Sequence, residues 1–192
     1  MKLHAGLLIG CLLLFPPIPA GAVGGRNLAI DAGASRVGFS LRTRWGQELE
    51  GRFPAYQGVV VAMPAGELQV RMVLYAREVE IVGHRHYTRL TRGEGFFHAR
   101  RWPEVELQSD PFSPQLLLQG GALAGIVGIR GLRRAEVFTI APATCARPLF
   151  DCPVVAAGEI SRSEYGMDRW GIAVGDEVRF HLQLWAWEPE AQ

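Results

Sequence analysis

The chain has 192 residues, and its 20 Lys and Arg side chains nearly balance 19 Asp and Glu, which leaves a formal net charge of +1 at pH 7. Nucleic-acid-binding proteins usually carry a strong basic excess, so this balance argues against that class. The length suits one domain around a single core, and no internal repeat or low-complexity linker marks a second one.

The first 22 residues have the pattern of a secretory signal peptide. Lys2 precedes an apolar run over residues 5–15, and a Pro-rich stretch then leads to Ala20-Gly21-Ala22, the small-x-small pattern of a cleavage site. The run is too short for a stable membrane span. We therefore predict a signal peptide over residues 1–22, a single domain over residues 23–192, and a periplasmic or secreted location.

Cys11 leaves an alternative open at this end of the chain. Together with residues 8–10 it fits a lipoprotein box, in which Cys11 would carry a lipid anchor. The apolar stretch before it is very short and the stretch after it stays apolar, which favours an ordinary residue of a cleaved signal.

From Leu28 onwards the chain is expected to form successive short strands, separated by Gly and Pro. Apolar and polar side chains alternate along three of them, as in half-buried strands. The apolar faces hold Val37, Phe39, Leu41 and Thr43 in the first, Leu68, Val70, Met72 and Leu74 in the second, and Val105 and Leu107 in the third. This pattern predicts an antiparallel sandwich or a closed barrel, and closure has the advantage that it removes exposed sheet edges.

The segment over residues 83–102 departs from the strand pattern, because its first half is polar without a period of two. We predict a short helical segment near residues 83–95, across one end of the barrel. His84 and His86 are possible metal ligands there, but no accompanying cluster of Asp, Glu or Cys supports a metal site. No metal is therefore expected.

Cys145 and Cys152 are the two cysteines that remain once the signal peptide is removed. An even pair in an exported chain favours a structural disulfide. A redox pair would usually show Cys-x-x-Cys spacing, and a metal site would need further ligands.

Residues 178–187 alternate without a break and predict the closing strand. A tight turn at residues 174–177 precedes it, because Gly175 reaches positive φ and Asp176 can bond its own backbone. One face of the strand holds Val178, Phe180, Leu182, Leu184 and Ala186, and the other holds Arg179, His181, Gln183, Trp185 and Trp187.

This C-terminal part resembles the signature of the YceI-like proteins, which are secreted, lipocalin-like β-barrels that bind polyisoprenoid lipids. The resemblance extends over essentially the whole mature chain. It is carried by residues 158–167 with 174–178, by Phe96-Phe97 and Trp102-Pro103, by residues 125–131, and by Asp31 with Ser35. It implies an all-β fold, an antiparallel eight-stranded lipocalin-like barrel.

Three positions differ from the family pattern. Ala34 stands where the family usually has His, Arg85-His86 replaces a common Arg-Asp, and Arg133 and Ala135 stand where Thr and then Pro are favoured. The differences therefore bear more on the ligand than on the fold, and the family's fold is the part of the resemblance that we expect this chain to share.

The resemblance also implies a ligand site inside the barrel. Side chains that share the inward phase of their strands are predicted to line an elongated apolar cavity for an isoprenoid tail: Phe39, Leu41, Val70, Met72, Leu74, Leu107, Phe180 and Leu182. Polar contacts at the mouth are expected from residues 84–92 and 165–170. No Gly-x-Ser-x-Gly elbow, catalytic triad spacing or phosphate loop is present, so neither an enzyme nor a cofactor is expected.

Two functions of different classes follow. The first is a periplasmic binding or carrier protein that holds an isoprenoid lipid, a polyprenol or an isoprenoid quinone. The alternative is a non-binding envelope barrel with a solid core, whose surface, for instance around Trp185 and Trp187, contacts a protein or membrane partner. Alternation alone does not separate them, because a cavity and a filled core need the same pattern.

Overall fold

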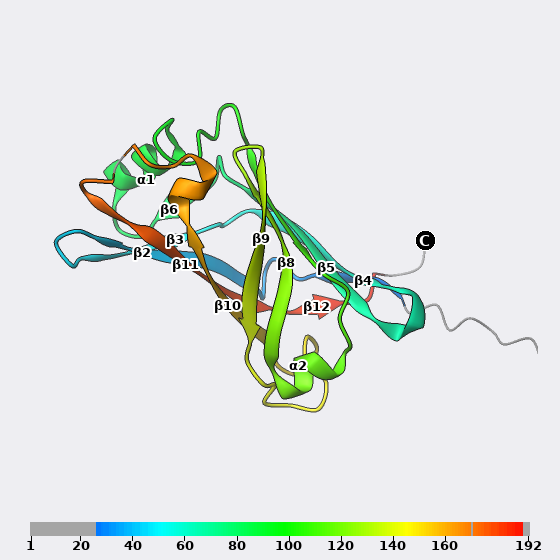
Figure 1. Ribbon diagram of the computed structural model, residues 1–192. Coiled ribbons are helices and arrows are strands. Elements are labelled where there is room, and N and C mark those ends of the chain that lie inside the picture. Colours follow the sequence, from blue (N-terminus) through cyan, green and yellow to red (C-terminus); the bar gives the residue numbers. More distant parts are fainter. Residues whose placement is uncertain (1–25, 170, 190–192) are drawn as a thin grey trace, which may run out of the picture.

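The computed structural model describes residues 26–169 and 171–189, so the predicted signal peptide and Cys11 lie outside the described residues. Within them the fold is a single antiparallel sheet (Figure 1). Its strands are β1 (Leu28–Ile30), β2 (Arg36–Thr43), β3 (Glu48–Arg52), β4 (Tyr56–Ala62), β5 (Leu68–Tyr75), β6 (Glu80–Ile81), β7 (Glu104–Ser109), β8 (Gly121–Ile129), β9 (Leu132–Ile140), β10 (Val154–Ser161), β11 (Val174–Leu184) and β12 (Ala186–Trp187).

The sheet curls around one core because its last two strands connect opposite ends of the strand order, which runs β12-β1-β4-β5-β7-β8-β9-β10-β11-β2-β3-β6. β11 pairs with β2 near one end of this order, and β12 pairs with β1 at the other. Trp185 alone separates β11 from β12, so one continuous segment serves both ends. The predicted all-β, antiparallel fold is confirmed, and the sheet expected to close into a barrel is a curled sheet of the lipocalin-like kind.

The predicted number of eight strands is wrong, since the sheet has twelve. Two long segments are each divided in two. Trp185 interrupts one, and a turn after Asp31 interrupts the other, where the carboxylate oxygen Oδ1 accepts hydrogen bonds from the backbone N–H groups of Gly33 (2.9 Å) and Ala34 (3.0 Å). The short strands β3 and β6 add to the count beside β2.

Short helices cover the two ends of the curled sheet (Figure 1). The predicted helical segment is present as α1 (Arg85–Arg92), which is tied to β6 by the backbone N–H of Ile81 donating to the Thr88 hydroxyl at 2.8 Å. At the other end lies α2 (Gln115–Gln119), with 3-10 turns η1 (Pro64–Gly66) and η2 (Arg162–Tyr165) elsewhere. We call these the α1 end and the α2 end. No helix in the described part of the chain has the length and apolar character needed to cross a membrane.

The closing strand β11 places its alternating side chains as predicted. Val178, Phe180, Leu182 and Leu184 are buried in the core, and Ala186 follows them in β12. Phe180 lies opposite Phe39 of β2 in the antiparallel register. The apolar faces predicted for β2 and β11 therefore lie side by side on the inner face of the sheet.

Strands β9 and β10 are paired over only part of their length. β9 pairs with β8 along its whole length, from Leu132 to Ile140, but with β10 only from Phe138 to Ile140. Nearer the α1 end, hydrogen bonds join β9 to η2, the turn that follows β10: the Tyr165 hydroxyl donates to Glu136 at 2.8 Å, and Arg134 Nε donates to the Glu164 backbone oxygen at 2.8 Å. We refer to this region as the β9–β10 seam.

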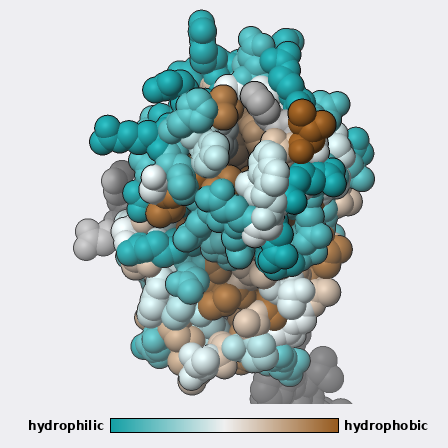
Figure 2. Space-filling view, turned by 90° about the vertical axis from the view of Figure 1, so that its left-hand side faces the viewer, coloured by the Kyte–Doolittle hydropathy of each residue, from teal (hydrophilic) through white to brown (hydrophobic). Residues whose placement is uncertain are grey.

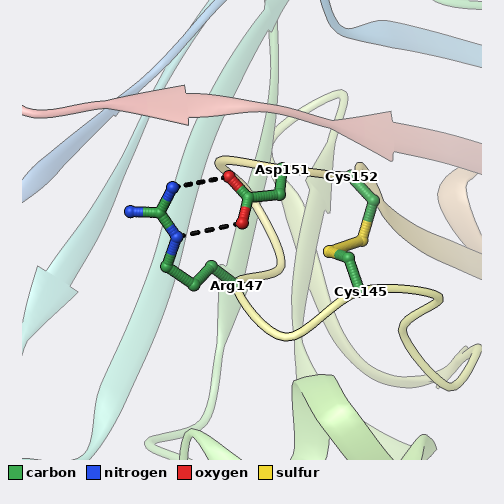
Figure 3. The surroundings of a disulfide bond; sticks show 4 residues. All are labelled: Cys145, Arg147, Asp151 and Cys152. Atoms are coloured by element: carbon green, nitrogen blue, oxygen red, sulfur yellow. Dashed lines mark hydrogen bonds and ion pairs between the residues drawn. A yellow bond between two sulfur atoms is a disulfide. The ribbon is translucent and has the colours of Figure 1, made fainter.

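The cysteine pair forms the predicted disulfide between Cys145 and Cys152, in the loop before β10 (Figure 3). Inside the same loop, the Arg147 guanidinium makes a two-pronged contact with the Asp151 carboxylate, at 2.9 and 2.7 Å. The Leu149 side chain is buried, and its backbone oxygen accepts from the Ala186 N–H at 3.0 Å. The loop is thus fixed to the closing strand at the α2 end.

We expect no free thiol at Cys145 or Cys152 in the purified protein. The residues are seven apart, and closing so short a loop stabilises the fold by about 2–3 kcal/mol on the chain-entropy account. Intact-mass measurement before and after reduction should show a gain of two hydrogens, and chemical denaturation should show the reduced form unfolding earlier. A native protein that reacts with two equivalents of thiol reagent at these positions contradicts the prediction.

Candidate functional site

An apolar cavity of about 80 Å³ lies inside the sheet at the α2 end. Strands β5 and β7–β11 line it, together with Leu117 of α2 and Phe112. Four of the predicted ligand-site residues line it: Val70, Met72, Leu107 and Leu182. Further lining side chains that the sequence analysis did not select are Phe112, Leu117, Leu123, Val127, Phe138, Ile140, Val154, Ala156 and Leu184.

The hydroxyl and the backbone oxygen of Ser109, which lines this cavity, both accept hydrogen bonds from β5. The Ser109 hydroxyl accepts from the Val70 backbone N–H at 2.9 Å, and the Ser109 backbone oxygen accepts from the Gln69 side-chain amide at 3.0 Å. The cavity therefore presents hydrocarbon surface and suits a ligand portion without hydrogen-bonding groups.

The α1 end of the interior is filled by aromatic rings. Phe39 packs against Phe53, Phe97 and Phe180, with ring centroids 5.7, 6.0 and 6.0 Å apart. Free space among these rings, Leu41 and their neighbours amounts to about 10 Å³, no more than the smallest space that holds one water molecule. Three predicted ligand-site residues, Phe39, Leu41 and Phe180, lie here, and Leu74 is fully buried without lining the cavity.

The eight predicted residues thus share the interior but divide between a hollow half and a packed half. That all eight contact a ligand stays a prediction. None of the side chains that line the cavity comes from residues 84–92 or 165–170, the segments expected at the mouth. Residues 84–92 and 165–169 belong to the α1 end, away from the hollow half, and Trp170 lies outside the described residues.

Arg162 is a buried cation at the edge of the aromatic cluster, with only 1% of its surface exposed. Its guanidinium donates to three backbone oxygens, those of Gly175 (2.8 Å), Val174 (3.2 Å) and Met167, and lies 5.6 Å from the centre of the Phe96 ring. Burial lowers the pKa of this guanidinium from its ordinary value. Arg162 belongs to the run of residues 158–167 that carries the family resemblance, and nothing in that run indicates that the side chain is buried.

Tyr165, from the same run, is completely buried. Burial, followed by the hydrogen bond to Glu136, raises the pKa of the Tyr165 hydroxyl far above its usual range. The phenol therefore stays protonated and keeps its bond across the β9–β10 seam at any physiological pH.

His84 and His86 lie at the start of α1, within 5.3 and 6.0 Å of the Tyr87 ring. In the described part of the chain, no group of three or more His, Cys, Asp or Glu side chains is arranged to hold a metal ion. Both imidazole rings pack against the ring of Tyr87.

The curled antiparallel sheet and its apolar interior define a lipocalin-like β protein. The chain belongs to the YceI-like domain family, whose pattern matches residues 28–186. No curated protein sequence matches the chain.

Solved structures share this fold at low sequence identity. The chain is similar to BcnA of Burkholderia cenocepacia, with 20% identity, a TM-score of 0.62, and coverage of 81% of this chain and 98% of that one. A polyisoprenoid binding domain from Saccharophagus degradans, implicated in plant cell wall breakdown, shows 13% identity and a TM-score of 0.62 over 86% of this chain and all of its own. The Campylobacter jejuni YceI protein shows 14% identity and a TM-score of 0.51, over 73% and 85% of the two chains.

Proposed function

We propose that this protein binds the apolar chain of a lipid, of the polyisoprenoid class, in the cavity at the α2 end. The observation that carries the proposal is the contrast within one core: the α1 end is packed to about 10 Å³ of free space, whereas about 80 Å³ stays open among aliphatic side chains at the α2 end. Membership of the YceI-like family supports it, as does the fold shared with the Saccharophagus polyisoprenoid binding domain.

The size of the cavity limits what it holds. An engineered cavity of about 150 Å³ takes up one benzene molecule, so about 80 Å³ suits the branched tip of an isoprenoid chain. One five-carbon unit removed from water contributes about 4 kcal/mol, whereas micromolar affinity needs about 8 kcal/mol to remain after ordering costs are subtracted. A second unit must therefore be covered, and the α2 end, with α2 and the disulfide loop, is where the chain would pass outwards.

The wider role that fits this proposal is a carrier or sequestering protein for a polyprenol or an isoprenoid quinone in the periplasm. It supposes export, through the signal peptide proposed for residues 1–22. The intact-mass measurement described for the disulfide also tests this point, because the exported protein should lack those residues. A diacylglyceryl adduct on Cys11 would instead indicate a lipoprotein.

Val70→Phe should weaken binding of isoprenoid alcohols of three or more units by about tenfold or more, because the ring fills most of the cavity. Val70 is half-buried, so the fold should tolerate the larger side chain. The matched control is Val73→Phe in the same strand, since Val73 is also half-buried but faces away from the cavity. Binding is measured by mass spectrometry of the ligand that co-elutes with the protein after incubation below the micelle concentration.

Affinity for the wild-type protein should rise from one to three isoprene units and then level off, because burial of hydrocarbon is non-directional and ends when the site is full. Equal retention by both variants, or flat affinity across chain lengths in a folded protein, contradicts cavity binding. That result would favour the second function, an envelope protein that works through its surface.

A further inference from the structure

Two large apolar side chains stand out from the α1 end. Trp45, at the tip of the β2–β3 hairpin, is 79% exposed, and Ile172, in the loop before β11, is 90% exposed. These two loops are bound to each other: the Arg44 backbone N–H donates to the Ala173 oxygen at 3.0 Å, and Arg44 Nε donates to the Gly171 oxygen at 3.1 Å. Trp45 and Ile172 thus project from one supported edge, which we call the apolar tip.

These exposed side chains would gain free energy if a binding partner buried them. A Trp or Ile side chain left in water forgoes the gain that burial gives, and neither residue packs on the core here. Single exposed apolar residues are common on protein surfaces, but two on hydrogen-bonded neighbouring loops form a joint contact surface.

Next to the apolar tip lies a basic segment. Residues 82–101 contain five arginines and one carboxylate, Glu94. Four of these arginines, Arg85, Arg89, Arg100 and Arg101, are exposed, and in the described part of the chain none has a carboxylate within ion-pair distance. The segment adjoins the loop of the apolar tip through Glu94, which contacts Arg169 at 3.6 Å.

We infer that this end of the molecule docks on an anionic lipid bilayer, with Trp45 and Ile172 entering the interface and the arginines of residues 82–101 contacting lipid phosphates. Trp is favoured at the boundary between headgroups and hydrocarbon, where its ring is half in each medium. Anionic lipids attract exposed arginines over roughly a Debye length. The inference does not depend on a lipid in the cavity, which lies at the other end.

The surface fits a bilayer better than a protein. Stable protein interfaces bury about 800 Å² on each partner around a continuous apolar centre. Figure 2 shows this side of the molecule as mostly hydrophilic, with apolar spots separated by polar side chains. A membrane interface accepts such spacing, because lipid headgroups rearrange around each inserted side chain.

The test uses vesicle co-sedimentation at low ionic strength, with phosphatidylcholine alone and with one-third phosphatidylglycerol. The wild-type protein should bind the anionic vesicles and lose binding as salt is raised. The double variant Trp45→Ser/Ile172→Ser should bind them about tenfold more weakly or worse. Arg85→Gln/Arg89→Gln should lose about tenfold on anionic vesicles and respond less to salt.

Trp187→Ser is the matched control, because Trp187 is 49% exposed but lies in β12, on a different part of the surface from the apolar tip. It should bind like the wild type, and all variants should keep the wild-type melting temperature because the changed side chains are exposed. The inference is overturned if the Trp45/Ile172 variant sediments like the wild type, or if the wild type binds neither kind of vesicle. Val70→Phe should leave sedimentation unchanged, so failure of cavity binding and failure of docking are distinguishable.

Discussion

Phe180→Asp is expected to lower the free energy of unfolding by about 4 kcal/mol or more, which for a domain of this size lowers the melting temperature by roughly 10 °C or more. Phe180 is 1% exposed, and its ring centroid lies 6.0 Å from that of Phe39 in the aromatic cluster. The substitution removes this packing and puts a carboxylate among rings that offer no hydrogen bond. Thermal and denaturant unfolding followed by circular dichroism measure the change.

His181→Asp is the control, since it introduces the same side chain one position along the same strand. His181 is exposed, and its ring lies over the backbone of Gly38, so only this contact is lost. We expect a change of less than about 1 kcal/mol. Similar losses at the two positions would mean that the inward face of β11 is misassigned.

The second large effect is expected at Arg162. Arg162→Met should cost about 3 kcal/mol or more, because three backbone oxygens, those of Met167, Val174 and Gly175, lose a charged donor where little water can replace it. Arg162→Lys should recover only part of this loss, since a single ammonium cannot reach the three oxygens as the planar guanidinium does.

Arg179→Met serves as the matched control for Arg162. Arg179 is an exposed arginine of β11 that pairs with Glu159, and exposed ion pairs contribute about 0–1 kcal/mol. Denaturant unfolding should therefore separate the two Met variants clearly. A loss at Arg162 no greater than that at Arg179 would show that the buried guanidinium does not hold the segment 167–175 in place.

Local patterns predicted much of this fold. The alternation along residues 178–186 identified the buried face of β11, because a period of two forces successive side chains to opposite sides. The polar stretch after residue 83 indicated α1, and the even pair Cys145 and Cys152, seven residues apart, indicated the disulfide. Each of these features depends on residues close together in the chain.

The strand count and the shape of the interior depend on contacts that no local pattern contains. Alternation states that Phe39 and Val70 point inwards, but it does not say that the first meets other rings while the second faces an open space. That outcome follows from register between distant strands, such as Phe180 opposite Phe39. Trp185 likewise continues the alternation in sequence and yet interrupts the strand, because Ser35 and Asp31 bond its backbone.

Arg162 illustrates a further limit. An arginine between two serines is usually solvent-exposed, and nothing in its neighbours reveals that the loop 167–175 folds back to supply three carbonyl oxygens. The family signature includes Arg162, but a sequence resemblance does not say which groups surround its side chain.

The β9–β10 seam is the place where the sheet should open most easily. β10 pairs with β9 only from Phe138 to Ile140, so the stretch from Leu132 to Val137 is joined on that side to η2 by the side chains of Tyr165 and Arg134 and not by a backbone ladder. Thermal fluctuations should therefore part the sheet here first, while the fully paired β10–β11 ladder stays shut. Such opening would expose the interior beside Phe138, which lines the cavity.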